Sequence, residues 1–220
     1  MEMEKNRKWE QTRMKTGHSG MMSMSTRVHA LFASLSGTIL DVGGSAGTLH
    51  EELVKQHAPE KIISLDIELI HVRTNQVIGD GQKMPFRNRA FNSILAGEVI
   101  EHVPDPRAFI RECWRVLDWN GVLALSTPNK KSWLNRMTHS YEMPLHLSLF
   151  DIESLSMLLD SEGFSIQSLK LFPFTEESSD GARNKWFFPV RNFMHSIVPN
   201  GLREDMVFVA RKIPVLSSKP

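Results

Sequence analysis

The stretch at residues 38–48 constrains the fold more than any other part of the chain. It reads T-I-L-D-V-G-G-S-A-G-T, an apolar and β-branched run that stops at glycines, which is typical of a strand buried on both faces. The glycines permit a tight turn that a ligand can approach closely. Leu49, Leu53 and Val54 then recur at helical spacing. A strand, a glycine turn and a helix N-terminus in this order predict a nucleotide-type ligand site.

The spacing of the glycines bears on the kind of ligand. A dinucleotide fingerprint needs glycines two and five positions after the first, and from Gly43 those positions hold Ser45 and Thr48. With Asp41 included, the loop reads D-x-G-x-S-x-G. It resembles motif I of the class I S-adenosylmethionine (SAM) methyltransferases, D/E-x-G-x-G-x-G, with serine in place of the middle glycine.

This resemblance implies that the loop packs against the methionine part of SAM. It also implies that Asp41 reaches the SAM amino group, directly or through water. The alternative interpretation is a tight turn of the kind found in any α/β protein. The loop residues concerned are Gly43, Gly44, Ser45 and Gly47.

Two further acidic residues follow predicted strands. K-I-I-S-L-D ends a second buried strand at Asp66, 25 residues after Asp41, where a βαβ unit places a carboxylate for ribose hydroxyls; a solvated loop aspartate is the alternative. The segment G-D-G-Q-K-M-P-F at residues 79–86 resembles the family's G-D-x-x-x-x-P-F, which implies that Asp80 binds the adenine amino group. The resemblance assigns the remaining cofactor contacts to Ile67, Gly81, Gln82 and Gly97.

Residues 97–106, which follow a predicted fourth strand at 91–96, carry the candidate acceptor chemistry. They read G-E-V-I-E-H-V-P-D-P and resemble the E-V-x-E-H-V of ubiquinone-type O-methyltransferases and of small-RNA 2′-O-methyltransferases. T-P-N at residues 127–129 matches the same two families. On a helix, Glu98, Glu101 and His102 would share one face. The fourth strand lies beside the first, where the sheet order reverses and ligands bind.

In the two resembled families, an E-x-x-E-H set and a later histidine hold magnesium or a similar ion against the substrate's hydroxyls. The resemblance therefore implies catalytic and metal-binding roles for Glu98, Glu101, His102 and His146. Such an ion would lower the pKa of an acceptor hydroxyl and hold the acceptor in line. The alternative is that carboxylates merely favour a helix N-terminus, because E-H-V also occurs in relatives without a metal.

The predicted fold class is α/β, with a Rossmann-like, seven-stranded, mostly parallel sheet and helices on both faces. The SAM-binding domain is expected at residues 21–212, after an N-terminal arm or lid (1–20) and before a tail (213–220). An inserted segment at 174–203 contains a helical pattern at 185–198. That pattern predicts a lid over an apolar acceptor, a helix packed on the core or a membrane-surface helix.

The remaining predicted elements are three helices and three strands. Helical patterns cover residues 21–35 and 109–117, and a third helix is capped by Asp151 and ended by Gly163. Further strands are predicted at 122–126, 164–171 and 206–210, and Asn120 with Gly121 should form a turn before the first of these.

Composition and charge indicate which partners and which cellular compartment to expect. The net charge of +1 gives no electrostatic reason to expect nucleic acid, and a single cysteine fits a reducing, cytoplasmic location. No run approaches the ~20 apolar residues of a membrane span, and the first residues do not resemble a secretory signal. The sequence therefore predicts transfer of a methyl group from SAM to a hydroxyl of a small, apolar or amphipathic acceptor, with S-adenosylhomocysteine (SAH) as product. A metal-dependent RNA 2′-O-methyltransferase and a non-catalytic partner subunit are the alternatives, and the oligomeric state is not predicted.

Overall fold

The computed structural model describes residues 26–44, 48–68, 75–133, 136, 146–172, 199–203 and 205–214. Four predicted features lie outside these ranges: the arm at 1–20, the loop residues Ser45 and Gly47, the helical pattern at 185–198, and all but the first two residues of the tail.

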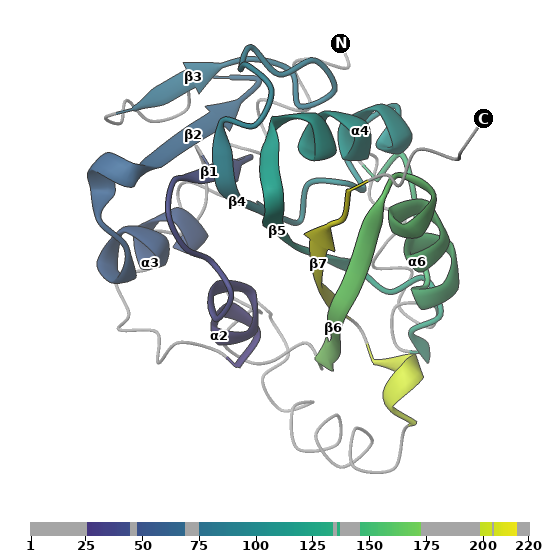
Figure 1. Ribbon diagram of the computed structural model, residues 1–220. Coiled ribbons are helices and arrows are strands. Elements are labelled where there is room, and N and C mark those ends of the chain that lie inside the picture. Colours follow the sequence, from purple (N-terminus) through teal and green to yellow (C-terminus); the bar gives the residue numbers. More distant parts are fainter. Residues whose placement is uncertain are drawn as a thin grey trace, which may run out of the picture.

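Seven strands form one sheet in the order β3-β2-β1-β4-β5-β7-β6 (Figure 1). β7 pairs antiparallel with both of its neighbours, whereas the pairs among β1 to β5 are all parallel. The predicted seven-stranded, mostly parallel sheet is therefore confirmed. The strands are β1 (Ile39–Val42), β2 (Ile62–Asp66), β3 (Gln76–Ile78), β4 (Phe91–Gly97), β5 (Leu117–Pro128), β6 (Phe164–Phe172) and β7 (Asp205–Lys212).

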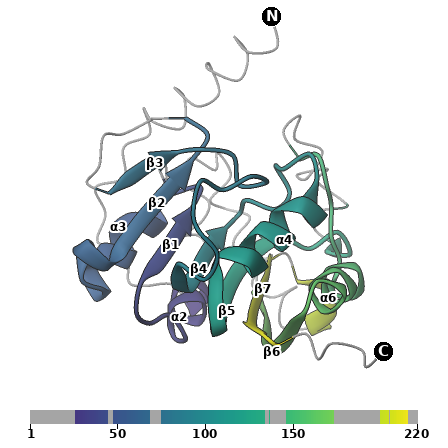
Figure 2. The same ribbon diagram turned by 45° about the horizontal axis from the view of Figure 1, so that its top comes forward.

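Helices cover both faces of the sheet (Figure 2). Side chains of α2 (Thr26–Phe32) and α3 (Thr48–Gln56) belong to one apolar core, and side chains of α4 (Pro106–Val116) and α6 (Ile152–Ser161) belong to the other. In β1, Ile39 packs in the first core and Leu40 in the second, because successive side chains of a strand point to opposite faces. Short 3-10 helices occur at Pro59–Lys61 and Asn200–Leu202.

The helix ends follow from local chemistry. Asp105 caps α4 by accepting a hydrogen bond from the Ala108 N–H, and a proline follows at the first helical position, where no N–H is needed. Asp151 caps α6, as predicted, and forms a reciprocal capping box with Ser154. Gly163 ends that helix with φ of 84°, a conformation that glycine adopts without strain.

Two local predictions need correction. Residues 98–105 form turns and bends after β4, so the helix expected to carry the E-x-x-E-H residues is absent. The expected turn at Asn120 and Gly121 lies inside β5, where the pairing with β4 shifts register and Asn120 adopts φ of 60°. Such a bulge bends a strand without ending it. Within the described ranges, no helix is both long and apolar enough to cross a membrane.

Candidate active site

The sheet order places the ends of β1 and β4 side by side at a switch point. β1 pairs with β2 on one side and with β4 on the other, and all three strands run in the same direction. The residues that follow their carboxyl ends therefore meet at one edge of the sheet, where ligands of open α/β sheets bind.

The glycine turn after β1 is built around Asp41. Gly43 has φ of 74°, which other residues rarely adopt, and a Cβ on Gly44 would lie 2.1 Å from Asp41 Oδ2. Asp41 is buried, and its Oδ2 lies 2.7 Å from His50 Nδ1 of α3. The carboxylate is thus held inside the turn, and its contact with the SAM amino group stays a prediction.

Asp66 and Asp80 lie at the same edge, the first at the end of β2 and the second after β3. Asp66 is the half-buried last residue of β2, and the next side chain, Ile67, leaves 70% of its surface exposed. Asp80 Oδ1 accepts a hydrogen bond from the backbone N–H of Gln82 at 2.8 Å and a second from its side-chain amide at 3.1 Å. The edge therefore offers two carboxylates and one exposed apolar side chain.

The remaining predicted cofactor residues have evident packing roles. Gln82 Oε1 accepts a hydrogen bond from the backbone N–H of the residue that caps α4, at 2.8 Å. A Cβ on Gly81 would lie 3.1 Å from the ring of Phe109, and one on Gly97, the last residue of β4, would lie 2.4 Å from Leu49. A side chain at either position would require its neighbour to shift.

Glu98 departs from the predicted arrangement. Its φ is 56°, which turns the chain out of any helical path directly after β4. The prediction that Glu98, Glu101 and His102 share a helix face is therefore wrong. Glu98 Oε1 instead accepts hydrogen bonds from Arg27 Nη1 at 2.9 Å and from the Ser126 hydroxyl at 2.7 Å.

The turns nevertheless gather the other three predicted ligands. One ligand atom from each of Glu101, His102 and His146 lies within 4.8 Å of the other two. His102 Nε2 is 3.9 Å from Glu101 Oε1, and the two imidazole centroids are 4.9 Å apart. The backbone N–H groups of Leu147 and Ser148 donate to the Glu101 carbonyl at 2.8 and 3.1 Å, which fixes the His146 segment beside the turn.

Glu101 is the buried member of this cluster. Its surface is 1% exposed, whereas the side chain of His102 is 39% exposed. The Thr127 hydroxyl donates to Glu101 Oε2 at 3.0 Å, and Oε1 makes no hydrogen bond to any residue of the described part. Burial and the nearby charges of Glu98 and Asp205 raise the pKa of Glu101 well above its usual value, although the Thr127 bond opposes this. A proton or a cation at Oε1 would relieve this cost.

The T-P-N residues join the segments around the cluster. The Thr127 hydroxyl orients Glu101. Asn129 is buried, and its amide donates to the carbonyls of Gly201 at 3.0 Å and Arg203 at 2.8 Å, while its backbone pairs with Phe150. The end of β5 is thereby tied to the segments that precede α6 and β7.

Two residues of this edge were not predicted from the sequence. His50 lies in the first turn of the helix after the glycines. This position only weakly indicates that His50 pairs with Asp41. Arg27 lies 71 residues before Glu98, and no local pattern marks it.

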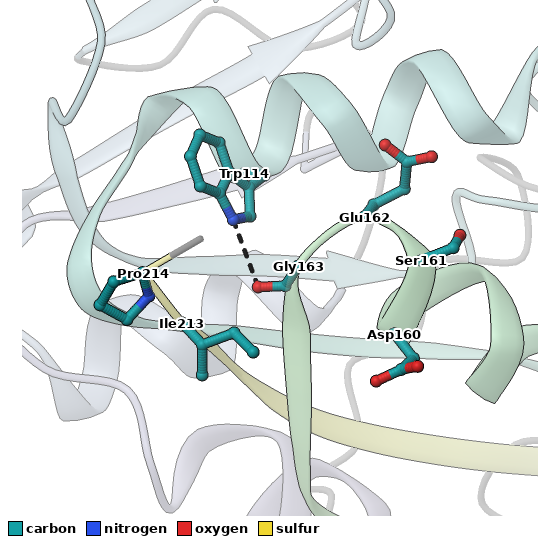
Figure 3. Close-up of a pocket in the computed structure, with 7 residues that line it drawn as sticks. All are labelled: Trp114, Asp160, Ser161, Glu162, Gly163, Ile213 and Pro214. Atoms are coloured by element: carbon teal, nitrogen blue, oxygen red, sulfur yellow. Dashed lines mark hydrogen bonds between the residues drawn. The ribbon is translucent and has the colours of Figure 1, made fainter. Parts of the chain in front are cut away.

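A cavity of about 510 Å³ lies at the opposite end of the sheet (Figure 3). Gly163 precedes β6 and Ile213 follows β7, so the cavity opens at the amino edge of the parallel strands. Trp114 Nε1 donates to the Gly163 carbonyl across it at 3.2 Å. The described residues that line the cavity are Trp114, Asp160, Ser161, Glu162, Gly163, Ile213 and Pro214. None of them is a predicted site residue.

Known proteins resemble this chain in sequence and in fold. It is 37% identical to the ubiquinone biosynthesis O-methyltransferase of Xylella fastidiosa (strain M23) over 109 residues, 44% of each chain. The protein of the same name from Xanthomonas euvesicatoria is 33% identical over 103 residues, 42% of this chain and 43% of that protein. The chain thus spans less than half the length of these curated relatives.

Solved structures share the fold at low sequence identity. A putative methyltransferase of Haloferax volcanii, in complex with the Trm112 activator, has a TM-score of 0.66 and 14% identity over 87% of this chain and 90% of that one. A SAM-dependent methyltransferase of Archaeoglobus fulgidus has a TM-score of 0.59 and 18% identity over 79% and 85%.

The model of the methyltransferase domain family matches residues 18–169, which is more than half of the chain. The matched span contains the glycine turn, the three aspartates at the sheet edge and the Glu101, His102 and His146 cluster. The chain therefore belongs to the methyltransferase domain family and has the class I SAM-dependent methyltransferase fold.

Proposed function

We propose that the protein transfers a methyl group from SAM to a hydroxyl of a small acceptor. The observation that carries this proposal is the cluster of Glu101, His102 and His146 at the carboxyl edge, beside the switch point. Similarity to ubiquinone biosynthesis O-methyltransferases supports oxygen as the acceptor atom. Leu147, next to the cluster, leaves 58% of its surface exposed, which supports an apolar or amphipathic acceptor.

For the cofactor, we propose that Asp66 binds the ribose hydroxyls and Asp80 the adenine amino group. The two carboxylates lie at the ends of adjacent strands, and the exposed side chain of Ile67, next to Asp66 in the chain, offers an apolar surface to a flat base. Asp41 and the glycine turn would hold the methionine part, directly or through water. These residues fit SAM because they combine acceptors for its hydroxyl and amino groups with a turn that a ligand can approach.

The cluster also fits a divalent cation held by Glu101, His102 and His146. Glu101 Oε1 is buried and makes no hydrogen bond to a described residue, so it can bind an ion without losing a partner. Ligand atoms on opposite sides of one ion are about 4 Å apart, close to the separations observed here. Two imidazoles and one carboxylate suit Mn²⁺, Fe²⁺ or Zn²⁺ at least as well as Mg²⁺. Such an ion would act as a Lewis acid on the acceptor hydroxyl.

The residues of the chain have to align the acceptor and remove its proton. When bound, SAM supplies a methyl group on a positively charged sulfur with a neutral thioether as leaving group. The acceptor oxygen gains the methyl group as the carbon–sulfur bond breaks, SAH remains, and the hydroxyl proton passes to a base. In a site without a cation, His102, the exposed imidazole of the cluster, is proposed as that base, with His146 beside it; with a cation bound to the imidazoles, the proton would pass to solvent. Alignment alone can supply about 7–11 kcal/mol of such a barrier.

Calorimetric titration with SAM, SAH and NAD tests the cofactor. We expect SAM and SAH to bind and NAD not to bind. A screen with labelled SAM against phenols, quinols, lipids and RNA then tests the acceptor class. Label on RNA alone would replace the small acceptor by a ribose 2′-hydroxyl, and binding of SAH without transfer to any class would favour a non-catalytic subunit.

Substitutions in the cluster test the acceptor site. His102→Asn and His146→Asn should each lower turnover at least tenfold and leave the SAH affinity unchanged, because these side chains lie beyond the predicted cofactor contacts. His29→Asn, on the exposed face of α2, is the matched control and should change neither. EDTA should abolish turnover and Mn²⁺ or Mg²⁺ restore it. Turnover that ignores EDTA would remove the cation from the proposal and leave the histidines as bases.

A further inference from the structure

Glu98 is anchored outside the cluster by contacts that involve both its backbone and its side chain. Its N–H donates to the Ser126 carbonyl at 3.0 Å, and its Oε1 accepts from the Ser126 hydroxyl at 2.7 Å. The same oxygen forms an ion pair with Arg27 Nη1 at 2.9 Å. Its left-handed backbone conformation sets the direction in which this side chain leaves the turn. Glu98 is thus the one member of the E-x-x-E-H pattern that does not belong to the gathered trio.

Arg27 approaches Glu98 from α2, which packs on the opposite face of the sheet from α4 and α6. It is the second residue of α2, and its guanidinium also lies 3.8 Å from Asp205 Oδ2, at the start of β7. Glu98 and Asp205 raise the pKa of Arg27 although burial opposes them, so the guanidinium stays charged. One arginine therefore joins α2, the end of β4 and the start of β7.

The charges around Glu101 depend on this arginine. Glu98 and Asp205 repel the Glu101 carboxylate, whereas Arg27 attracts all three acids. An arginine here opposes the approach of a second cation, and it occupies the Glu98 carboxylate. The effect acts at short range, between side chains that are 25% exposed in Arg27 and 30% exposed in Glu98, so solvent screens it only in part.

We propose that Arg27 is a positioning residue of the acceptor site. It holds Glu98 away from Glu101, His102 and His146, so that the cation site has three protein ligands instead of four. This inference rests on the proposed function, because it concerns the cation named there. A site with three protein ligands keeps coordination positions open for acceptor oxygens and water, as catalytic metal sites do.

Mn²⁺ titration by calorimetry on the SAH-loaded full chain tests this assignment without relying on turnover. Glu101→Gln should weaken Mn²⁺ binding at least tenfold, because it replaces a charged carboxylate ligand by a neutral amide. Glu98→Gln should change it less than about threefold, because an amide oxygen still accepts from Arg27 and Ser126 and no ligand is lost. A loss for Glu98→Gln equal to that for Glu101→Gln would overturn the inference and leave the proposed function intact.

Removal of the arginine provides the second, opposite test. Arg27→Met should tighten Mn²⁺ binding about tenfold, because it removes a cation and releases a carboxylate. Arg27→Lys keeps the charge but loses the guanidinium fork, so it should bind Mn²⁺ less tightly than Arg27→Met does. Adding Glu98→Gln to Arg27→Met should cancel most of the gain. A merely structural role for Arg27 predicts weaker binding in Arg27→Met, with no rescue by the second change.

A control variant and two further outcomes of the Mn²⁺ titration complete the test. Arg107→Met, which removes an exposed arginine paired with Glu162, is the matched control and should leave Mn²⁺ binding unchanged. If no form of the protein binds Mn²⁺, the cation and this inference both fail, while the SAH titration still tests the methyltransferase assignment separately. If Arg27→Met weakens binding, the inference alone is overturned.

Discussion

Lys212 is the basis of a quantitative prediction on the pH dependence of stability. Its surface is 1% exposed, its Nζ donates to the Leu117 carbonyl at 2.7 Å, and it lies 4.0 Å from the ring centroid of Trp114 and 4.6 Å from that of Trp119. Burial, together with the nearby charge of Arg89, lowers the pKa of Lys212 from 10.5 to about 8. The carbonyl and the indole rings oppose this shift, because they favour the charged amine.

The direction of the effect follows from proton linkage. Because the pKa in the folded state is the lower one, the unfolded chain binds more protons between pH 8 and pH 10.5. The stability of the fold should therefore rise with pH across this window and be lowest below pH 8. A shift from 10.5 to about 8 corresponds to up to about 3 kcal/mol, at ~1.36 kcal/mol per unit.

Lys212→Met isolates this contribution because methionine has a similar length and no charge. We expect the free energy of unfolding of the wild type to rise by up to about 3 kcal/mol more than that of the variant between pH 7.5 and 10.5. Urea denaturation followed by far-UV circular dichroism at several pH values measures this difference. Lys55→Met, at a lysine whose side chain is 63% exposed, is the control and should run parallel to the wild type.

Parallel curves for the wild type and Lys212→Met would refute the reasoning. They would mean that the Leu117 carbonyl and the two indoles compensate the burial of the ammonium group in full. A wild type that loses stability relative to the variant as pH rises would reverse the sign and show that the folded protein holds the charged amine more tightly than water does.

Three further predictions concern single residues. Asp66→Ala should weaken SAH binding tenfold or more by calorimetry, because a charged hydrogen bond is worth about 1.5–3 kcal/mol; unchanged affinity would reject the ribose assignment. Gly44→Ala should weaken SAH binding as well, because the new methyl group would displace Asp41 from His50, and a crystal structure of the variant with that pair intact would contradict this. Asp151→Ala should lower the free energy of unfolding by about 0.5–2 kcal/mol at pH 7. Because the pKa of Asp151 in the fold is lowered to about 2, that difference should shrink as pH falls from about 4 to 2, and urea melts that keep it at pH 2 would contradict the capping role.

Features that depend on near neighbours in the chain were predictable from the sequence. Six of the seven strands follow from apolar or alternating runs, and the cap at Asp151 and the stop at Gly163 follow from groups within one helical turn. The aspartates after the first three strands were predictable for the same reason, since a residue that follows a parallel strand must lie at the carboxyl edge. The order of these signals determined the fold class and pointed to the family.

The acceptor site required the tertiary structure. Glu98, Glu101 and His102 have a spacing that suits a helix, but the left-handed conformation of Glu98 replaces the helix by turns. His146 joins the cluster because two backbone hydrogen bonds dock its segment on Glu101. Neither the left-handed conformation of Glu98 nor the docking of the His146 segment produces a periodic pattern in the sequence, because both depend on which strand ends become neighbours.

The two glutamates of the E-x-x-E-H motif show most clearly what the sequence determined and what the tertiary structure decided. The sequence by itself determined that an E-x-x-E-H pattern follows the fourth strand, at the edge where ligands bind. Only the tertiary structure decided that Glu101 is buried with the histidines, whereas Glu98 pairs with Arg27, 71 residues away. Burial and long-range ion pairs arise when the sheet brings α2, β4 and β7 together, and sequence spacing carries no information about that packing.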